Sequence, residues 1–123
     1  MADGLDELGK ILMEKVRDEA IDDWNRILSG RMKSDRAQAV HQRVSKMGAE
    51  AGALVREMVP QIVDTTLHHL LWTLEQNQER LRLTVVSEEG ETDAAAESDG
   101  LPGELYSGEG WIARFSKGPK SWL

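Results

Sequence analysis

The sequence predicts a mainly helical α+β domain, in which three helices pack antiparallel and a short C-terminal two-stranded β-ribbon lies on one side of them. Apolar residues recur every three or four positions through most of residues 3–81, which is the period of helices that bury one face. Two short β-prone runs follow, and an acidic stretch separates them. An all-α fold is the alternative.

The first helix is expected from about residue 3 to residue 29. Its main apolar stripe advances in steps of three and four residues and comprises Leu5, Leu8, Leu12, Val16, Ala20, Trp24 and Ile27. More than one face could be covered, because further apolar residues widen this stripe, namely Ile11, Met13, Ile21 and Leu28. Arg17 and Asp18 are expected on the solvent side. Gly30 suits the position after the helix end, because glycine enters the left-handed region without steric cost.

The second helix is expected over residues 34–58, with Ser34 or Asp35 as its N-cap. Its apolar residues keep strict steps of three and four: Ala37, Val40, Val44, Met47, Ala51, Leu54 and Met58. Gly48 and Gly52 fall inside this helix, and a break near Gly48 is the competing interpretation. We favour a continuous helix, because the pattern crosses both glycines without slipping.

The third helix is expected over residues 60–80. The apolar step lengthens to five residues between Met58 and Val63, and a proline disfavours helical conformation in the residue before it. The sequence therefore predicts a break or a strong kink at Pro60, where the second and third helices fold back on each other. Trp24 and Trp72 fall on or near the core faces of their helices, so both are expected to pack in the core.

The C-terminal third carries the two β-prone runs. We expect a short strand over about residues 82–87, an acidic loop over residues 88–104, and a strand followed by a tail over about residues 105–123. The run from Trp111 to Phe115 alternates as a half-buried strand does, and it would pair with the first strand. Because the acidic loop has almost no large apolar side chain, we expect a mobile excursion that can be shortened without loss of the fold.

Composition excludes several kinds of site. The chain of 123 residues is long enough for one domain, and it has no cysteine, which excludes disulfides, thiolate metal ligands and a cysteine nucleophile. The N-terminal residues lack the basic and apolar regions of a signal peptide, and no run reaches the roughly 18 apolar residues of a membrane span. We expect a soluble, cytoplasmic, single-domain protein with no membrane partner.

Charge is distributed unevenly along the chain. The net charge is −7, and residues 88–104 hold seven acids and no base, so the other 15 acids and 15 bases balance. This acidity disfavours nucleic acid as a partner and favours a basic protein, although such a run usually just faces water. Between residues 26 and 46 the single acid Asp35 is outnumbered by six bases, namely Arg26, Arg31, Lys33, Arg36, Arg43 and Lys46. These bases could contact phosphates or the chain's own acidic loop.

Asp64 and His68 are the main candidates for chemistry, because they lie four residues apart on one helix face. A carboxylate four residues before an imidazole could orient it for metal binding or proton transfer. A metal site needs about three or four ligands, however, so this pair is incomplete unless packing brings further residues to it. We expect no bound metal and no other cofactor, with His68 lying beside the core.

The predicted function is a non-enzymatic protein–protein interaction module that self-associates as a homodimer. The candidate partner-binding residues are two tryptophans near the C-terminus and the first acids of the loop: Trp111, Trp122, Glu88, Glu89, Glu91 and Asp93. One concrete form would be an acidic partner or immunity-type inhibitor of a basic protein. The alternative is a metal-assisted or acid/base enzyme centred on Asp64 and His68.

Overall fold

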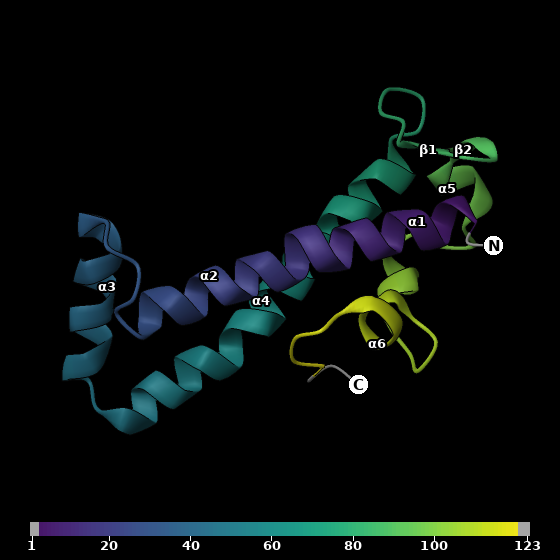
Figure 1. Cartoon of the computed structure of the whole chain (residues 1–123). Helices are drawn as coiled ribbons and strands as arrows, with labels where there is room; N and C mark the ends of the chain where they lie inside the picture. Colours follow the sequence, from purple (N-terminus) through teal and green to yellow (C-terminus); the bar gives the residue numbers. More distant parts are fainter. Residues whose placement is uncertain (1–2, 121–123) are drawn as a thin grey trace.

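Two long helical arms run side by side, joined at one end by a crossing helix and at the other by a small C-terminal segment (Figure 1). This computed structural model describes residues 3–120. In chain order the elements are α1 (Gly4–Ile11), the π-helix η1 (Leu12–Arg17), α2 (Asp18–Leu28), α3 (Asp35–Lys46), α4 (Ala49–Gln76), β1 (Thr84–Ser87), β2 (Gly90–Asp93), α5 (Ala94–Glu97), the 3-10 helix η2 (Pro102–Leu105) and α6 (Trp111–Phe115). The predicted class, a predominantly helical α+β fold with a two-stranded antiparallel sheet, is confirmed.

The first arm is a single helical rod, α1–η1–α2, but the face that it buries changes along its length. After Gly9 the buried positions are Met13, Arg17, Ile21 and Leu28, each one residue later than the predicted stripe of Leu12, Val16, Ala20 and Ile27. The π segment causes this shift, because an extra residue in a helix rotates the later part of that helix by about 100°. The predicted solvent position of Arg17 is therefore wrong, and so is the predicted core position of Trp24, which is 41% exposed.

A tight turn ends the first arm, as predicted at Gly30. The φ angle of Gly30 is 79°, its N–H donates to the carbonyl of Ile27, and the N–H of Arg31 donates to the carbonyl of Arg26. This pair of hydrogen bonds is the Schellman motif that closes many helices. Ser34 then caps α3, because its hydroxyl oxygen accepts from the N–H of Ala37.

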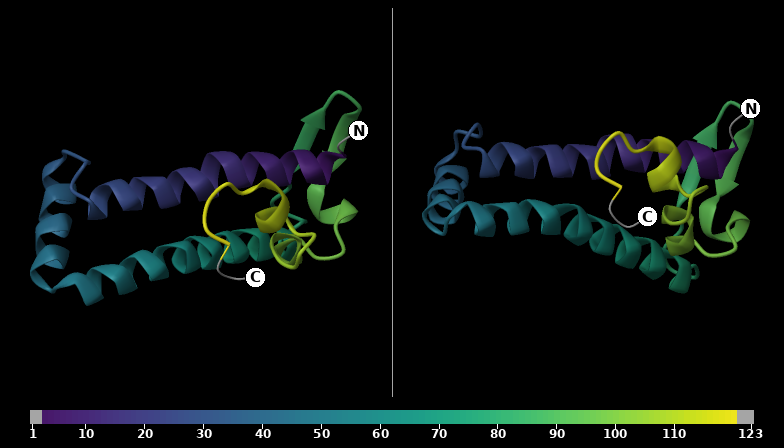
Figure 2. Two further views of the ribbon diagram at one scale, coloured as in Figure 1. Left: turned by 60° about the horizontal axis from the view of Figure 1, so that its bottom comes forward. Right: turned by 90° about the horizontal axis from the view of Figure 1, so that it is seen from below.

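The predicted helix boundaries at 58 and 60 are wrong. The chain breaks instead at Gly48, whose φ of 96° lies in the left-handed region and is incompatible with helix continuation. α4 then runs uninterrupted through Pro60, which is itself buried, and the helix curves gently (Figure 2). Local steric preference disfavours a proline there by about 3 kcal/mol, so tertiary packing has overridden it.

Buried side chains form two clusters. The larger joins both arms to the C-terminal segment and contains Leu8, Met13, Leu67, Leu71, Val85, Ala94, Ala95, Leu101, Leu105, Trp111 and Ile112. The smaller lies toward α3 and contains Ile21, Leu28 and Val59, with Val44, Val55 and Val63 packed against it. The half of the molecule near α3 is therefore held mainly by short side chains.

The C-terminal segment differs most from expectation. β1 pairs with β2 in a hairpin that joins Thr84 to Asp93 and Ser87 to Gly90, so the acidic stretch supplies the second strand. The predicted strand from Trp111 is instead the helix α6. The Trp111 indole lies against Gly9, and a Cβ atom on Gly9 would overlap the ring. Residues 88–104 are thus a folded part of the domain, not the mobile excursion that we expected.

Candidate functional site

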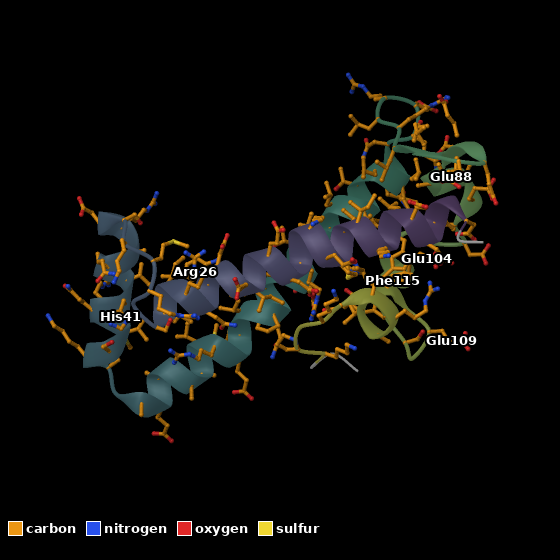
Figure 3. All side chains as sticks on the ribbon, in the orientation of Figure 1. Arg26, His41, Glu88, Glu104, Glu109 and Phe115 are labelled. Carbon is orange, nitrogen blue, oxygen red and sulfur yellow. The ribbon has the colours of Figure 1, made fainter. Side chains whose placement is uncertain are left out.

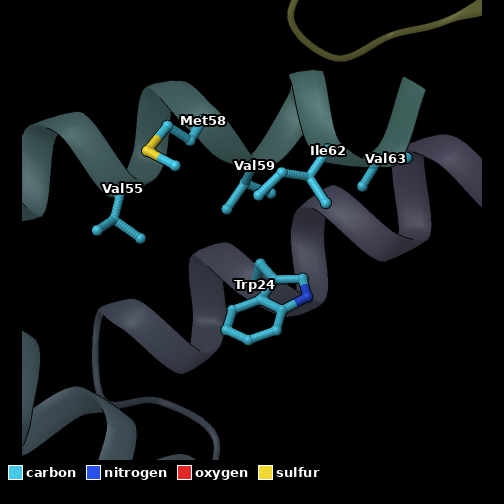
Figure 4. Close-up of a pocket in the computed structure, with 6 residues that line it drawn as sticks. All are labelled: Trp24, Val55, Met58, Val59, Ile62 and Val63. Atoms are coloured by element: carbon cyan, nitrogen blue, oxygen red, sulfur yellow. The ribbon is translucent and has the colours of Figure 1, made fainter. Parts of the chain in front are cut away.

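An open apolar groove lies between α2 and α4, and we call it the apolar groove. It has a volume of about 220 Å³ and is lined by Trp24, Val55, Met58, Val59, Ile62 and Val63. The indole of Trp24 lies across the groove from α4, where Met58 stands farther along the helix and Ile62 lies closer to the ring (Figure 4). These three rim side chains are 41%, 43% and 56% exposed, whereas Val59 on the floor is buried. Large apolar side chains are thus left in water although a core lies directly beneath them.

Met58 and Ile62 also border a second hollow, of about 350 Å³, with Gln61, Thr65 and Thr66. The two side chains therefore form a ridge between two depressions, and Leu54, one turn earlier, is also more than half exposed. The hydroxyl groups of Thr65 and Thr66 each donate to a carbonyl four residues back, at 2.8 Å. Since those hydroxyls are satisfied within α4, the second hollow does not need a polar occupant.

Valines explain why the groove stays open. Val55, Val59 and Val63 follow one another at steps of four on the side of α4 that packs toward α2. These short side chains meet Ile21 and Leu28, while the longer Met58 and Ile62 stand at the rim. Contiguous exposed apolar side chains are one feature of protein contact sites, so the apolar groove is the candidate functional surface of the described chain.

The two charged regions of the sequence occupy opposite ends of the molecule. We call the six bases between residues 26 and 46 the basic pole and the seven acids of residues 88–104 the acidic pole. Arg26 and His41 mark one end in Figure 3, and Glu88 and Glu104 mark the other. Among residues 3–120 the salt bridges reach neither pole, apart from a contact of 3.7 Å between Arg26 and Asp23. The suggested pairing of the basic residues with the chain's own acidic loop is therefore wrong.

A buried polar network lies midway between the poles, where the arms meet the C-terminal segment. Arg17 donates from Nε and Nη2 to the two carboxylate oxygens of Asp64, at 2.6 and 3.0 Å, and from Nη1 to Ser116 Oγ, at 2.8 Å. Ser116 Oγ in turn donates to Asp18 Oδ1, and Asp18 Oδ2 accepts from the backbone N–H of Lys117. Arg17 and Asp64 have no exposed surface, so this ion pair joins the two arms inside the fold and no solute can reach it.

His68 and Tyr106 lie beside this network. His68 Nδ1 shares a hydrogen bond of 2.9 Å with the Tyr106 hydroxyl. Burial raises the pKa of Tyr106 above its ordinary value of about 10, and the negative charge of Asp64 raises it further. The phenol is therefore held in its protonated, hydrogen-bonding form more strongly than in the unfolded chain.

Alkaline stability should reveal this shift. A folded pKa above the unfolded one contributes stability that is complete below about pH 10 and is lost as pH rises through the folded value. Between about pH 8 and pH 11, the wild-type protein should therefore lose more unfolding free energy than Tyr106→Phe, as measured by urea denaturation. Equal losses in the two proteins would show that the Tyr106 phenol titrates alike in the folded and unfolded states.

The predicted chemical pair does not form a site. Asp64 is bound by Arg17 and His68 by Tyr106, so the two side chains point to different partners. Within the described part of the chain, no three His, Asp or Glu side chains come close enough to hold a metal ion. The spacing of four residues correctly placed both side chains on α4, but it could not reveal that Arg17 donates hydrogen bonds to both oxygens of the Asp64 carboxylate.

Some of the predicted partner-binding residues are exposed in the structure and others are buried. Trp111 is 1% exposed, so its prediction as an exposed anchor is wrong, and Trp122 lies outside the described residues. Glu88, Glu89 and Glu91 are exposed at the tip of the hairpin, where they remain candidates. Asp93 is partly buried, and its carboxylate accepts from the N–H of Ala96 as the N-cap of α5.

Sequence reasoning missed the groove, because it assigned Trp24 and Met58 to the core. Trp72 was likewise expected in the core and is 48% exposed. One signal was available: the step of five from Met58 to Val63 shows that these residues do not share a face. The buried face of α4 in fact passes through Val55, Val59 and Val63, which leaves Met58 and Ile62 on the rim.

Comparisons with known proteins identify no relative of this chain. None of the helices in residues 3–120 is both long and apolar enough to cross a membrane. The chain matches no protein-family model, no curated protein and no solved structure.

Proposed function

We propose that this protein is a self-associating protein–protein interaction module, and that the apolar groove with its ridge of Met58 and Ile62 is the contact surface. The observation that carries this proposal is the exposure of Trp24, Met58 and Ile62 together on one side of two packed helices. Tryptophan and methionine are enriched at protein interfaces, where their side chains bury a large apolar area. Covering these side chains would remove an apolar surface that water solvates poorly.

A second copy of the chain is the occupant that we propose. A ridge flanked by two hollows complements itself when a two-fold axis places the same surface opposite, since each ridge then fits a hollow of the partner. Each copy also carries a basic pole and an acidic pole. The basic pole of one copy can therefore attract the acidic pole of the other, whereas two like poles repel each other. A basic protein bound by the acidic pole remains a separate possibility that this surface does not require.

Binding is favoured over catalysis by the state of Asp64. An enzyme centred on this carboxylate would need a substrate or metal to reach it, yet its exposed fraction is 0% and both oxygens already accept hydrogen bonds from Arg17. Separating a buried ion pair of this kind costs about 3–5 kcal/mol. The rim of the apolar groove, in contrast, is accessible without any rearrangement.

The double substitution Met58→Gln with Ile62→Gln tests the proposal. Glutamine keeps helix propensity and adds no charge, so the monomer should fold as before while the ridge becomes polar. We expect wild-type dimers in multi-angle light scattering at micromolar concentration, and association weakened at least about 30-fold in the double variant.

The matched control is Ile11→Gln, which removes an apolar side chain that is 51% exposed at the end of α1 and belongs neither to the groove and its ridge nor to either pole. It should associate as the wild type does. A wild-type monomer at high micromolar concentration would reject self-association. Unchanged dimers of the double variant would show that the contact surface lies elsewhere.

A further inference from the structure

We infer that two copies pair antiparallel, with the basic pole of each copy against the acidic pole of the other. This inference rests on the proposed self-association and specifies its geometry. The two poles lie at opposite ends of the arms in every view of the fold (Figures 1 and 2). Residues 26–46 carry six bases and one acid, whereas residues 88–104 carry seven acids and no base.

The poles cannot satisfy each other within one molecule. α4 spans most of the distance between them, and its 28 residues extend about 42 Å at a rise of 1.5 Å per residue. That is about five Debye lengths at physiological ionic strength, so attraction between the poles of a single chain is screened almost completely. A complementary charged surface for either pole would therefore have to belong to another molecule.

Neighbouring residues leave the sign of each end unchanged. Near the acidic pole, Arg80 and Arg82 precede β1, but Asp3 and Glu7 at the start of the first arm add further negative charge, while Asp6 pairs with Arg114. At the other end, Asp23 lies near Arg26, and the remaining five bases are exposed and form no salt bridge among residues 3–120: Arg31, Lys33, Arg36, Arg43 and Lys46. A parallel dimer would place like charges together at both ends, which the antiparallel dimer avoids.

The position of the ridge fits this arrangement. Ile62 lies at the middle of α4, which runs from Ala49 to Gln76. A two-fold axis perpendicular to α4 and passing beside Ile62 would align the two copies of α4 over their full length in opposite directions. The basic pole of one copy then meets the acidic pole of the other twice, once at each end of the dimer. Such a dimer has closed two-fold symmetry, so no unpaired contact surface remains to which further copies could add.

Cysteine cross-linking tests the arrangement directly, because the natural chain contains no cysteine. Lys46→Cys marks the basic pole, Glu89→Cys marks the acidic pole, and both positions are exposed. The two variants are mixed in equal amounts, allowed to exchange, and treated with a short bismaleimide. Mass spectrometry should find the mixed pair in several-fold excess over either pair of like variants. Gln61→Cys, next to the ridge, is the matched control and should cross-link to itself.

Each outcome has a distinct meaning. Like pairs in excess, in a protein that scatters light as a dimer, would overturn the antiparallel arrangement and leave self-association standing. A series of trimers and larger species would show open head-to-tail growth, which also contradicts the closed dimer. A wild-type monomer, with no cross-links even from Gln61→Cys, would reject both proposals.

Charge reversal provides a second measurement. Arg36→Glu, Arg43→Glu and Lys46→Glu together should weaken dimerisation about tenfold at low salt, and so should Glu88→Lys, Glu89→Lys and Glu91→Lys together. A protein with all six changes should recover wild-type association, because both pole contacts become attractive again. Single-pole reversals without effect, or no recovery in the combined protein, would overturn the inference.

Discussion

Arg17→Ala should lower the free energy of unfolding by about 3–5 kcal/mol, a large part of the stability of a domain of this size. The substitution leaves the Asp64 carboxylate buried without the two hydrogen bonds that it receives from the guanidinium group. It also removes the donor to Ser116 Oγ and so loosens the C-terminal segment from the first arm. Urea denaturation followed by circular dichroism would measure the loss.

Two comparisons isolate the cause. Lys15→Ala, an exposed position in the same π segment, should change stability by less than about 0.5 kcal/mol. The double variant Arg17→Met with Asp64→Leu removes both charges and should recover much of the loss, because no unpaired buried charge remains. If Arg17→Ala cost less than about 1 kcal/mol, the ion pair would be dispensable for the fold.

Leu101→Ala should lower the free energy of unfolding by about 2–5 kcal/mol, although it changes a residue inside the acidic stretch. Leu101 has no exposed surface, it belongs to the larger core cluster, and its N–H donates to the side chain of Glu75 on α4. Truncating it opens a cavity between the C-terminal segment and α4. The measurement is again chemical denaturation, with the unchanged slope of the transition as a check on two-state behaviour.

Asp99→Asn is the matched control, since Asp99 lies two residues away and is exposed. It should be nearly neutral. If the stretch were the mobile loop that its composition suggests, both variants would be neutral, and replacing residues 94–105 by a glycine-rich linker would leave cooperative unfolding intact. The buried Ala94, Ala95 and Leu105 make us expect the opposite.

The existence of the helices could be predicted from the sequence, but their phase and their breaks could not. A period near 3.6 identifies a helix, whereas a single extra residue moves the buried face from Val16 to Arg17 without erasing the periodicity. At Gly48 and Pro60 local preferences pointed both ways, and packing decided the outcome. Pro60 lies inside α4, and the helix break lies at Gly48, where no heavy atom comes within 4 Å of the Cβ position.

The candidate site depended on contacts that sequence spacing does not encode. Asp64 and His68 were paired because they are four residues apart, yet the partner of Asp64 lies 47 residues away in sequence. Trp111 was assigned to an interface because it lies near the C-terminus, but Gly9 leaves room for its indole in the core. The alternation around Trp111 predicted a strand, and five residues are too few to distinguish that pattern from one turn of helix.

The π segment gives the first arm a fixed phase. With Leu8 facing the larger cluster before it and Ile21 facing the smaller cluster after it, the two halves of the arm are set at a definite rotation to each other. The number of residues between them therefore sets this rotation. A conservative exchange within Leu12–Arg17 would be felt locally, whereas removing one residue would turn α1 by about 100° relative to α2. Gly9 would then no longer lie against the Trp111 indole. The first arm could pack correctly in the larger cluster or in the smaller one, but not in both.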